Sequence, residues 1–367
     1  MPFTFAVGSP ISTDVCPTAE GSLGLFFLNG SDTSTVYFLT ARHVAFPRTT
    51  RDDNKLYEHK NQSLRRDITI FGKNGIVKHL NAIRTRIGKH DDSAKRHQHQ
   101  INTLEGKEDD VTVKKRKKVQ TRLDKAQKAS ETLEKFYDDT FKFWNAAQSR
   151  TIGFITLSPP IAFSVGDKKY TEDWAIGQLD ANKINTDTFF PNILDLGFEF
   201  EPKKLDSMMN PNSENPPSFK YPDGRLLHIR GIVSDDEIQN PTDKDKNGDP
   251  LLMVLKRGKK TGLTVGRTNN VKSFIRKYWK DSKDTSTELA VHGLESVRFS
   301  DHGDSGAVVV DGTGRVVGMV TGGVSRSGTS PDINYVTPAE FIFSRIKNHG
   351  LNPNIDFSSG AQLAHHQ

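Results

Sequence analysis

Residues 300–323 read SDHGDSGAVVVDGTGRVVGMVTGG, and they carry the clearest structural signal in the chain. A polar turn leads into the apolar run AVVV, the small residues DGTG interrupt that run, and a second apolar run follows. Two short apolar runs joined by Gly-rich residues predict two adjacent antiparallel β-strands. The turn before them holds Ser305 between small residues, so it is either an ordinary surface turn or a loop that carries a nucleophile.

The same texture of short apolar runs and Gly, Asn or Ser turns recurs along most of the chain. It fills 20–83, where DITIF and GIVKHL continue the strand-like pattern of GLFFLNG and TVYFLTA, and it returns from Arg150. Residues 1–83 and 151–199 are together expected to form the first β unit. A second all-β unit is expected at 225–350, with AEFIFSRIKNHG as its closing helix. The Pro- and Asn-rich segment 200–224 is expected to be a connector, and 351–367 a flexible tail.

Residues 84–150 interrupt the first β region with a different period. We expect a helical hairpin or coiled coil inserted there, with a shorter helix near 92–104 and a long helix after it, because 111–148 lacks Gly and Pro. The aromatic end of the long helix is expected to dock on the strands and the basic end to project outward. One apolar stripe runs along the long helix through Val119, Leu123, Ala126, Leu133, Phe136, Thr140, Trp144 and Ala147.

Composition limits the classes of protein that this chain can belong to. Its 367 residues are 34% hydrophobic and 26% charged, with a formal net charge of +6 and one cysteine, Cys16. An intrachain disulfide is impossible, which favours a reducing, cytoplasmic compartment. We find neither a secretory signal nor an apolar run long enough to cross a membrane. The basic run Lys114–Lys118 is interpreted as a solvated helix face, with nuclear import or nucleic-acid binding as alternatives.

Two residues in the β regions have the chemistry of a nucleophile and its base. Ser305 has a hydroxyl that is a poor nucleophile until a base takes its proton, and His43 in YFLTARHVAF has the side chain suited to that task. A carboxylate must then hold the imidazole in one tautomer. Asp173 and Asp67 each precede an apolar strand, and both are candidates.

These motifs resemble the chymotrypsin-like (trypsin-fold) serine proteases. LTARHV is similar to their histidine motif, TEDWAIGQLD to their acidic motif, and GDSGAVVV with GRVVGMVTGG to their nucleophile loop and the strands after it. The order His, Asp, Ser is also that of the family. VLKRGKKTGLTVGR and RTIGFITLSPP further resemble segments of intracellular fungal trypsin-like proteins. The resemblance covers both β regions and implies two six-stranded antiparallel β-barrels, with the helical hairpin inserted in the first.

The resemblance also implies roles for individual residues. His43 would be the general base and then the general acid, Ser305 the nucleophile, and Asp173, favoured over Asp67, the residue that orients His43. The backbone N–H groups of Gly303 and Ser305 would form the oxyanion hole. This sequence lacks the Ile-Val-Gly-Gly start of zymogen-type relatives, whose new N-terminus pairs with the Asp before the nucleophile. Asp304 is therefore expected to have another partner.

Four residues are expected to bind the substrate by the same resemblance. Phe299 occupies the position that often floors the specificity pocket, which implies an apolar or small substrate side chain rather than Arg or Lys. Thr321, Gly322 and Gly323 match the strand that lines that pocket and binds the substrate backbone.

The sequence thus favours a serine endopeptidase that acts on a polypeptide through an acyl-enzyme and needs no metal or organic cofactor. One alternative is an inactive scaffold with the same fold. The other is a module that binds a protein partner, a second copy of itself or nucleic acid through the basic helical insertion, with nucleic acid the less favoured ligand. A membrane partner is not expected.

Overall fold

The computed structural model describes residues 6–47, 53–60, 64–184, 189–212, 219–268, 270–278, 283–294, 297–323 and 332–357. It divides into two compact units. One is the helical unit Lys73–Arg150, and the other is a β unit formed by the chain on both sides of it, residues 5–72 and 151–367.

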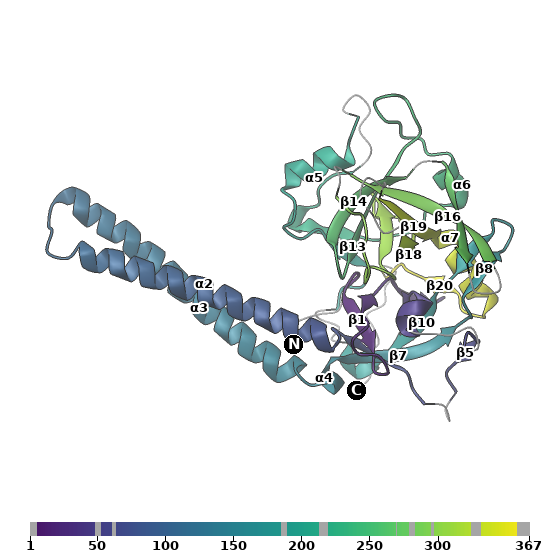
Figure 1. Ribbon diagram of the computed structural model, residues 1–367, viewed down its shortest axis with the longest axis horizontal. Coiled ribbons are helices and arrows are strands. Elements are labelled where there is room, and N and C mark those ends of the chain that lie inside the picture. The colour runs from purple at the N-terminus through teal and green to yellow at the C-terminus, as the bar shows by residue number, and fades with distance from the viewer. Residues whose placement is uncertain are drawn as a thin grey trace. The chain divides into compact units, whose positions relative to one another are not determined.

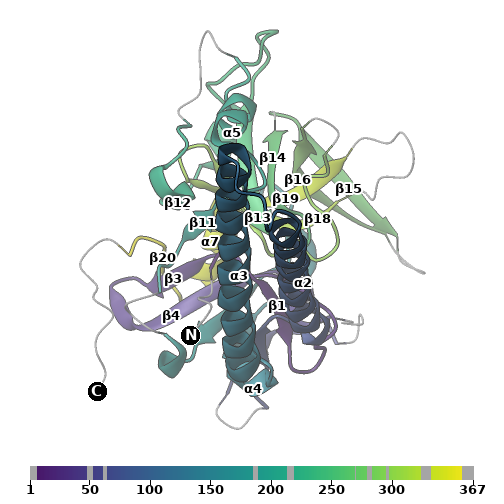
Figure 2. The ribbon, with the colours of Figure 1, turned by 90° about the vertical axis from the view of Figure 1, so that its left-hand side faces the viewer.

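The helical unit is a pair of long helices that lie side by side in both ribbon views (Figures 1 and 2). They are α2 (Lys73–Thr103) and α3 (Asp110–Trp144), and the short helix α4 (Ala147–Arg150) follows them. Ile101 of α2 packs with Val119 and Leu123 of α3, and this cluster lies beside the turn that joins the two helices. Burial of such an apolar stripe is what stabilises a long helix in water.

The insertion begins earlier than its sequence suggested, at Lys73 rather than residue 84. The run GIVKHL was interpreted as strand-like, but its apolar residues Ile76 and Leu80, with Ile83, recur at helical spacing and are all buried. The segment near 92–104 is accordingly the end of α2 and not a separate short helix.

The predicted stripe on α3 is largely confirmed. Its buried residues are Val119, Leu123, Ala126, Ser130, Thr140 and Trp144. Ala147 lies beyond the end of this helix, in α4. Docking of the aromatic end on the strands stays a prediction.

The basic run lies in the first half of α3. Asp109 caps this helix by accepting a hydrogen bond from the Thr112 amide at 2.9 Å. Arg116 donates to the carbonyls of Leu104 at 2.6 Å and Lys107 at 3.0 Å, in the turn between the helices. This arginine therefore helps to hold the turn, whereas the four lysines of the run are exposed. A role for them in nucleic-acid binding or nuclear import stays a prediction.

The β unit contains two nine-stranded sheets, and the first is built mainly from the N-terminal half of the chain. Its order is β2-β1-β6-β7-β10-β4-β3-β20, and β5 also pairs with β7. The pairs are antiparallel, as the resemblance implied. The strands are β1 (Pro10–Thr13), β2 (Gly21–Ser22), β3 (Phe26–Asn29), β4 (Asp32–Thr40), β5 (Tyr57–Glu58), β6 (Asp67–Ile70), β7 (Thr151–Ser158), β10 (Ala175–Leu179) and β20 (Pro353–Asn354).

The second sheet contains a ring of strands closed by hydrogen bonds. Its path is β14-β13-β17-β18-β19-β16, and a further antiparallel pairing of β14 with β16 joins the two ends. Strands β8, β9 and β15 extend it outside the ring. Its strands are β8 (Ala162–Val165), β9 (Tyr170–Glu172), β13 (Leu252–Gly258), β14 (Gly262–Thr268), β15 (Lys272–Tyr278), β16 (Lys283–Gly293), β17 (Val308–Asp311), β18 (Val316–Gly323) and β19 (Ile333–Pro338).

An apolar core fills the ring. It includes Val254, Val291, Phe299, Val309 and Val336, each fully buried. The hairpin β17–β18 is the pair of strands predicted from AVVV and VVGMV. Both sheets can be followed in Figure 1, where the strands of the ring carry the green and yellow colours of the C-terminal half.

Short elements connect and cover the sheets. A two-stranded ribbon joins β11 to β12, and α7 is the predicted closing helix. The elements are α1 (Arg42–Ala45), the 3-10 turns η1 (Ala181–Lys183) and η2 (Asp223–Arg225), β11 (Ile193–Asp195), β12 (Leu226–His228), α5 (Pro202–Met209), α6 (Asp235–Gln239) and α7 (Ala339–Asn348).

Three expected boundaries differ from the structure. Segment 151–199 does not belong to the first sheet alone, because β8 and β9 pair with the second sheet. The expected connector 200–224 contains helix α5, which buries Leu205 and Met209. The expected flexible tail contains β20, whose pairing with β3 holds it to the first sheet, while 358–367 lie outside the described residues.

Cys16, the single cysteine, is buried. None of the helices in the described ranges has the length and hydropathy that a membrane crossing requires.

Candidate active site

His43 is placed by the transition from β4 to the short helix α1. Strand β4 ends at Thr40, and the helix starts two residues later. The side chain of Arg42 is almost fully buried beside it and donates to the Ser158 carbonyl at 2.9 Å and the Lys55 carbonyl at 2.7 Å. This arginine ties the short helix to β7, so His43 stands on a fixed backbone.

Asp173 holds His43 at two points. Its Oδ1 accepts a hydrogen bond from the His43 amide at 3.0 Å, and its Oδ2 lies 2.6 Å from Nδ1 of the imidazole. The carboxylate side chain is 8% exposed, and the imidazole is 38% exposed. With Nδ1–H donating to the carboxylate, the neutral ring carries its lone pair on Nε2, the tautomer that a general base needs.

The competing carboxylate, Asp67, is held elsewhere. It lies on β6 and pairs with Arg65, with Nε at 2.5 Å from Oδ1. Arg65 also reaches Asp180 at 2.7 Å. The carboxylate that meets His43 is therefore Asp173, which lies between β9 and β10, as the order of the motifs indicated.

Ser305 sits in a loop that both sheets hold. The Ser22 amide of β2 donates to the Ser305 carbonyl at 2.9 Å, and Ser22 Oγ donates to the Gly303 carbonyl at 3.0 Å. On the other side, the Gly306 amide donates to the Val320 carbonyl of β18 at 2.9 Å. Sequence reasoning missed Ser22, because a lone serine 283 positions before the loop gives no local signal.

The backbone of this loop leaves two amides uncommitted. Within the described parts of the chain, the N–H groups of Gly303 and Ser305 donate to no acceptor. Gly303 has φ of 106°, which residues with a Cβ rarely adopt. That these two amides form the expected oxyanion hole stays a prediction.

A cavity of about 910 Å³, including the space open to solvent, contains both His43 and Ser305 on its wall. Ser305 Oγ makes no hydrogen bond to any described residue, so the serine and the histidine share the cavity without a bond between them. Thr321, Gly322 and Gly323 line the same cavity, and their contact with a substrate stays a prediction.

Phe299 does not line this cavity, and its expected role as an apolar pocket floor is corrected. The ring is fully buried in the core of the second sheet, with Val254 and Val291. An aromatic ring gains most free energy in such a core, and no sequence motif fixes which way it points. The residues near Phe299 in the sequence or structure that do line the cavity are polar. They are Arg298, Ser300, Asp301, His302, Asp332 and Asn334.

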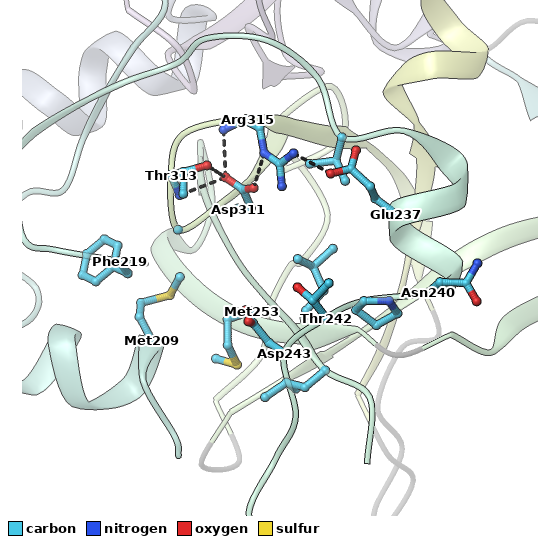
Figure 3. Close-up of a pocket in the computed structure, with 15 residues that line it drawn as sticks. Met209, Phe219, Glu237, Asn240, Thr242, Asp243, Met253, Asp311, Thr313 and Arg315 are labelled. Carbon is cyan, nitrogen blue, oxygen red and sulfur yellow. Dashed lines mark hydrogen bonds and ion pairs between the residues drawn. The ribbon is translucent and has the colours of Figure 1, made fainter. Parts of the chain in front are cut away.

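A second cavity, of about 680 Å³, lies away from these residues (Figure 3). Arg315 bridges two of its carboxylates, at 2.8 Å from Asp311 and 2.7 Å from Glu237. Burial, with a smaller effect of Asp311, raises the pKa of Asp243. The figure shows these ion pairs within the wall, and the described residues that line this cavity include neither a serine nor a histidine. The candidate site is therefore the cavity of Ser305.

Comparison with known proteins gives structural similarities alone. No protein-family model and no curated protein matches the sequence. Among solved structures, the chain is similar to Cellulomonas bogoriensis chymotrypsin, at 14% identity and a TM-score of 0.30 over 56% of this chain and 91% of that one. It is similar to the inactive form of the Rv3671c protease at 11% identity and a TM-score of 0.32, over 93% and 87% of the two chains.

A third similarity is to the HtrA-type protease AlgW with a tripeptide, at 12% identity and a TM-score of 0.34, over 94% of this chain and 62% of that one. By their names, these neighbours are a chymotrypsin and two other proteases. TM-scores of this size do not define a fold.

Proposed function

We propose that the chain is a serine endopeptidase of chymotrypsin-like fold that cleaves polypeptides through an acyl-enzyme. The observation that carries the proposal is a cavity whose wall holds both Ser305 and the His43 ring that Asp173 orients. The Ser305 loop adds two amides that donate to no described acceptor. A surface turn needs none of them.

Acylation would use each feature once. As a peptide enters the cavity, Ser305 Oγ attacks the carbonyl carbon, and Nε2 of His43 takes the hydroxyl proton. The carbonyl oxygen becomes an oxyanion and accepts hydrogen bonds from the amides of Gly303 and Ser305. His43 then gives its proton to the departing amine, which leaves an ester between Ser305 and the acyl half of the substrate. Catalytic hydrogen bonds commonly tighten when substrate binds, so the unbonded Ser305 is compatible with this step.

Deacylation would repeat the sequence with water. His43 takes a proton from the water molecule that attacks the ester, and the same two amides receive the negative charge. The proton returns to Ser305 as the acid leaves. Asp173 stays ionised throughout and stabilises the imidazolium form of His43. The side chains named here suffice for every step.

The substrate backbone would lie against β18. Thr321, Gly322 and Gly323 form the end of that strand and line the cavity beside Ser305. Two glycines in succession leave room for a peptide to approach the strand backbone. Strand β17 pairs with β18 from Val316 to Met319, so residues 321–323 lie beyond that pairing. An extended polypeptide that hydrogen-bonds to this end of the strand is the substrate class that fits.

The proposal is tested by a fluorophosphonate probe, which forms a covalent bond with an activated serine. We expect the full-length chain to be labelled at Ser305, and the label to disappear in Ser305→Ala. Ser300→Ala is the matched control, because this serine lines the same cavity but bonds to Asn334, with Oγ at 2.6 Å from Oδ1. A folded wild-type chain that takes no label would favour the inactive scaffold instead.

A further inference from the structure

The residue before Ser305 is an aspartate whose side chain is completely buried. Oδ1 of Asp304 accepts hydrogen bonds from the amides of Lys260 at 2.7 Å and Thr261 at 3.2 Å. Oδ2 accepts from the Asp301 amide at 2.9 Å and the Thr261 hydroxyl at 2.7 Å. A buried carboxylate requires such donors, and here three belong to the turn between β13 and β14 and one to the loop of Ser305.

A lysine from the neighbouring strand supplies the opposite charge. Nζ of Lys256, on β13, lies 3.5 Å from Oδ2 of Asp304, and both side chains have zero exposure. The ammonium group also donates to Thr261 Oγ1 and, at 3.3 Å, to the Gly262 carbonyl. Burying an ammonium ion is costly unless it is paired and hydrogen-bonded, so filling space alone does not explain a lysine here.

Contacts with β13 and the turn after it hold the loop that contains Asp304 and Ser305. The side chain of Asp304 passes so close to β13 that a Cβ on Gly258 would lie 2.4 Å from Oδ1. The Lys259 amide donates to Ser22 Oγ at 3.0 Å, and that hydroxyl donates to the Gly303 carbonyl. The turn between β13 and β14 thus bonds directly to Asp304 and, through Ser22, to the carbonyl of Gly303.

We propose that Lys256 is a positioning residue that, by neutralising Asp304, holds the 301–305 loop with the amides of Gly303 and Ser305 in place for an oxyanion. The inference rests on the proposed function, since it assigns the lysine a role in the reaction of Ser305. It also means that the loop is ordered by side chains of the intact chain. Cleavage to create a new N-terminus is then unnecessary for activity.

The charge of Lys256 should make the labelling of Ser305 depend on pH. Burial lowers the pKa of Lys256 to about 8, against the opposing effect of Asp304, while Arg257 lowers and Asp332 raises it further. As the pH rises through this value, Lys256 loses its charge and Asp304 loses its counter-ion. The loop should then loosen, and labelling of Ser305 should slow.

Global unfolding would not mimic this effect. The pKa of Lys256 in the folded chain lies below its ordinary value of 10.5. The unfolded chain therefore binds more protons between these two values, and the contribution of Lys256 to the free energy of unfolding grows with pH. Loss of labelling with retained stability above about pH 8 separates positioning from a merely structural role.

The experiment measures the rate of fluorophosphonate labelling of the full chain between about pH 6 and pH 10, beside a thermal melt at each pH. The probe's phosphoryl oxygen needs the same two amides as an oxyanion. We expect Lys256→Met to label on the order of 100-fold more slowly at neutral pH, the cost of losing one oxyanion donor. The alkaline decline of the wild-type rate should be absent from this variant. Lys260→Met is the matched control, because its side chain is exposed and its backbone donor remains.

Two further measurements test the proposal even if Lys256→Met does not fold. The double variant Lys256→Met with Asp304→Asn removes both charges, and we expect it to melt cooperatively yet label slowly. The alkaline decline of the wild-type chain needs no variant. Wild-type labelling that stays constant to about pH 10, or a folded Lys256→Met that labels as fast as wild type, would overturn this inference alone. A wild-type chain unlabelled at every pH would overturn the proposed function and this inference with it.

Discussion

At the scale of single residues, Asp173 contributes to His43 twice. It accepts from the backbone amide and from Nδ1, so it fixes both the place and the tautomer of the ring. Motif order alone ranked this carboxylate above Asp67, and the geometry agrees with that ranking. Phe299 shows that assigning roles by resemblance has a limit. Its position, six residues before Ser305, was matched to the floor of the specificity pocket, but its ring lies in the core.

Replacing Asp173 by asparagine keeps the size of the side chain but removes the carboxylate that sets the tautomer of His43. The new side-chain amide would present an N–H to Nδ1 of His43, which forces the imidazole proton onto Nε2 and leaves no base for Ser305. We expect the labelling rate of Asp173→Asn to fall by about 10⁴-fold. Asp67→Asn should label at the wild-type rate, and equal losses in both variants would contradict the assignment.

Phe299→Leu tests the corrected position of the aromatic ring. The ring packs in the core of the second sheet, so we expect a loss of about 1 kcal/mol in the free energy of unfolding. Cleavage preference, measured by sequencing the products of a peptide mixture, should stay as in wild type. A changed preference at the residue before the cleaved bond would show that Phe299 contacts substrate after all.

At the scale of elements, local periodicity predicted many of the strands, the long helix α3 and the closing helix α7, but it missed the short helices α1, α4, α5 and α6. It could not predict which distant strands pair. The hairpin β17–β18 and the long helix α3 follow from runs of consecutive residues. Strand β20 depends on pairing with β3, more than 320 residues away, and it looked like a loose tail. The pairing of Lys256 with Asp304 escaped notice for the same reason, because 48 residues separate the two charges.

The helical unit is inserted into a β-hairpin, which makes it separable. Strands β6 and β7 are antiparallel neighbours, with Thr69 opposite Thr151, so the chain leaves and re-enters the sheet at adjacent positions. A chain in which residues 73–150 are replaced by an Asn-Gly turn should therefore close the same hairpin. We expect it to fold and to label at the wild-type rate.

The measurements are circular dichroism and the labelling rate, with Ser305→Ala in the shortened chain as the control for specificity. A folded but unlabelled shortened chain would mean that the helical unit takes part in the reaction.

At the scale of the whole molecule, an intrachain disulfide is impossible, and buried polar contacts join elements from distant parts of the chain. Glu288 of β16 is almost fully buried and accepts from the Thr171 amide at 3.2 Å and the Thr337 hydroxyl at 3.0 Å. It thereby links β9, just before Asp173, to β19 in the ring. Composition could not reveal this contact, because an exposed glutamate in a strand has the same local pattern.

Glu288 should make the stability of the protein depend on pH. Burial, opposed by its hydrogen bonds, raises the pKa of Glu288 to about 7 from 4.5. A carboxyl whose pKa is raised by folding contributes stability that is complete below the unfolded value and is lost as the pH rises through the folded value. The contribution should fall by about 3 kcal/mol between roughly pH 4 and pH 8. Urea unfolding of wild type and Glu288→Gln at both ends of this range measures it.

The Gln variant should lose this part of the pH dependence, whereas Glu131→Gln, at an exposed helical position, should keep it. An unchanged slope in Glu288→Gln would assign the dependence to other groups.

The most direct test of the central claim is cleavage of peptide bonds by the purified full-length chain. Wild type and Ser305→Ala would be incubated with a mixture of unstructured peptides, and new termini would be identified by mass spectrometry. The account predicts new termini that accumulate with time in the wild-type sample and are absent with Ser305→Ala. Equal cleavage by both chains, or none by a wild-type chain whose Ser305 takes the fluorophosphonate label, would contradict it.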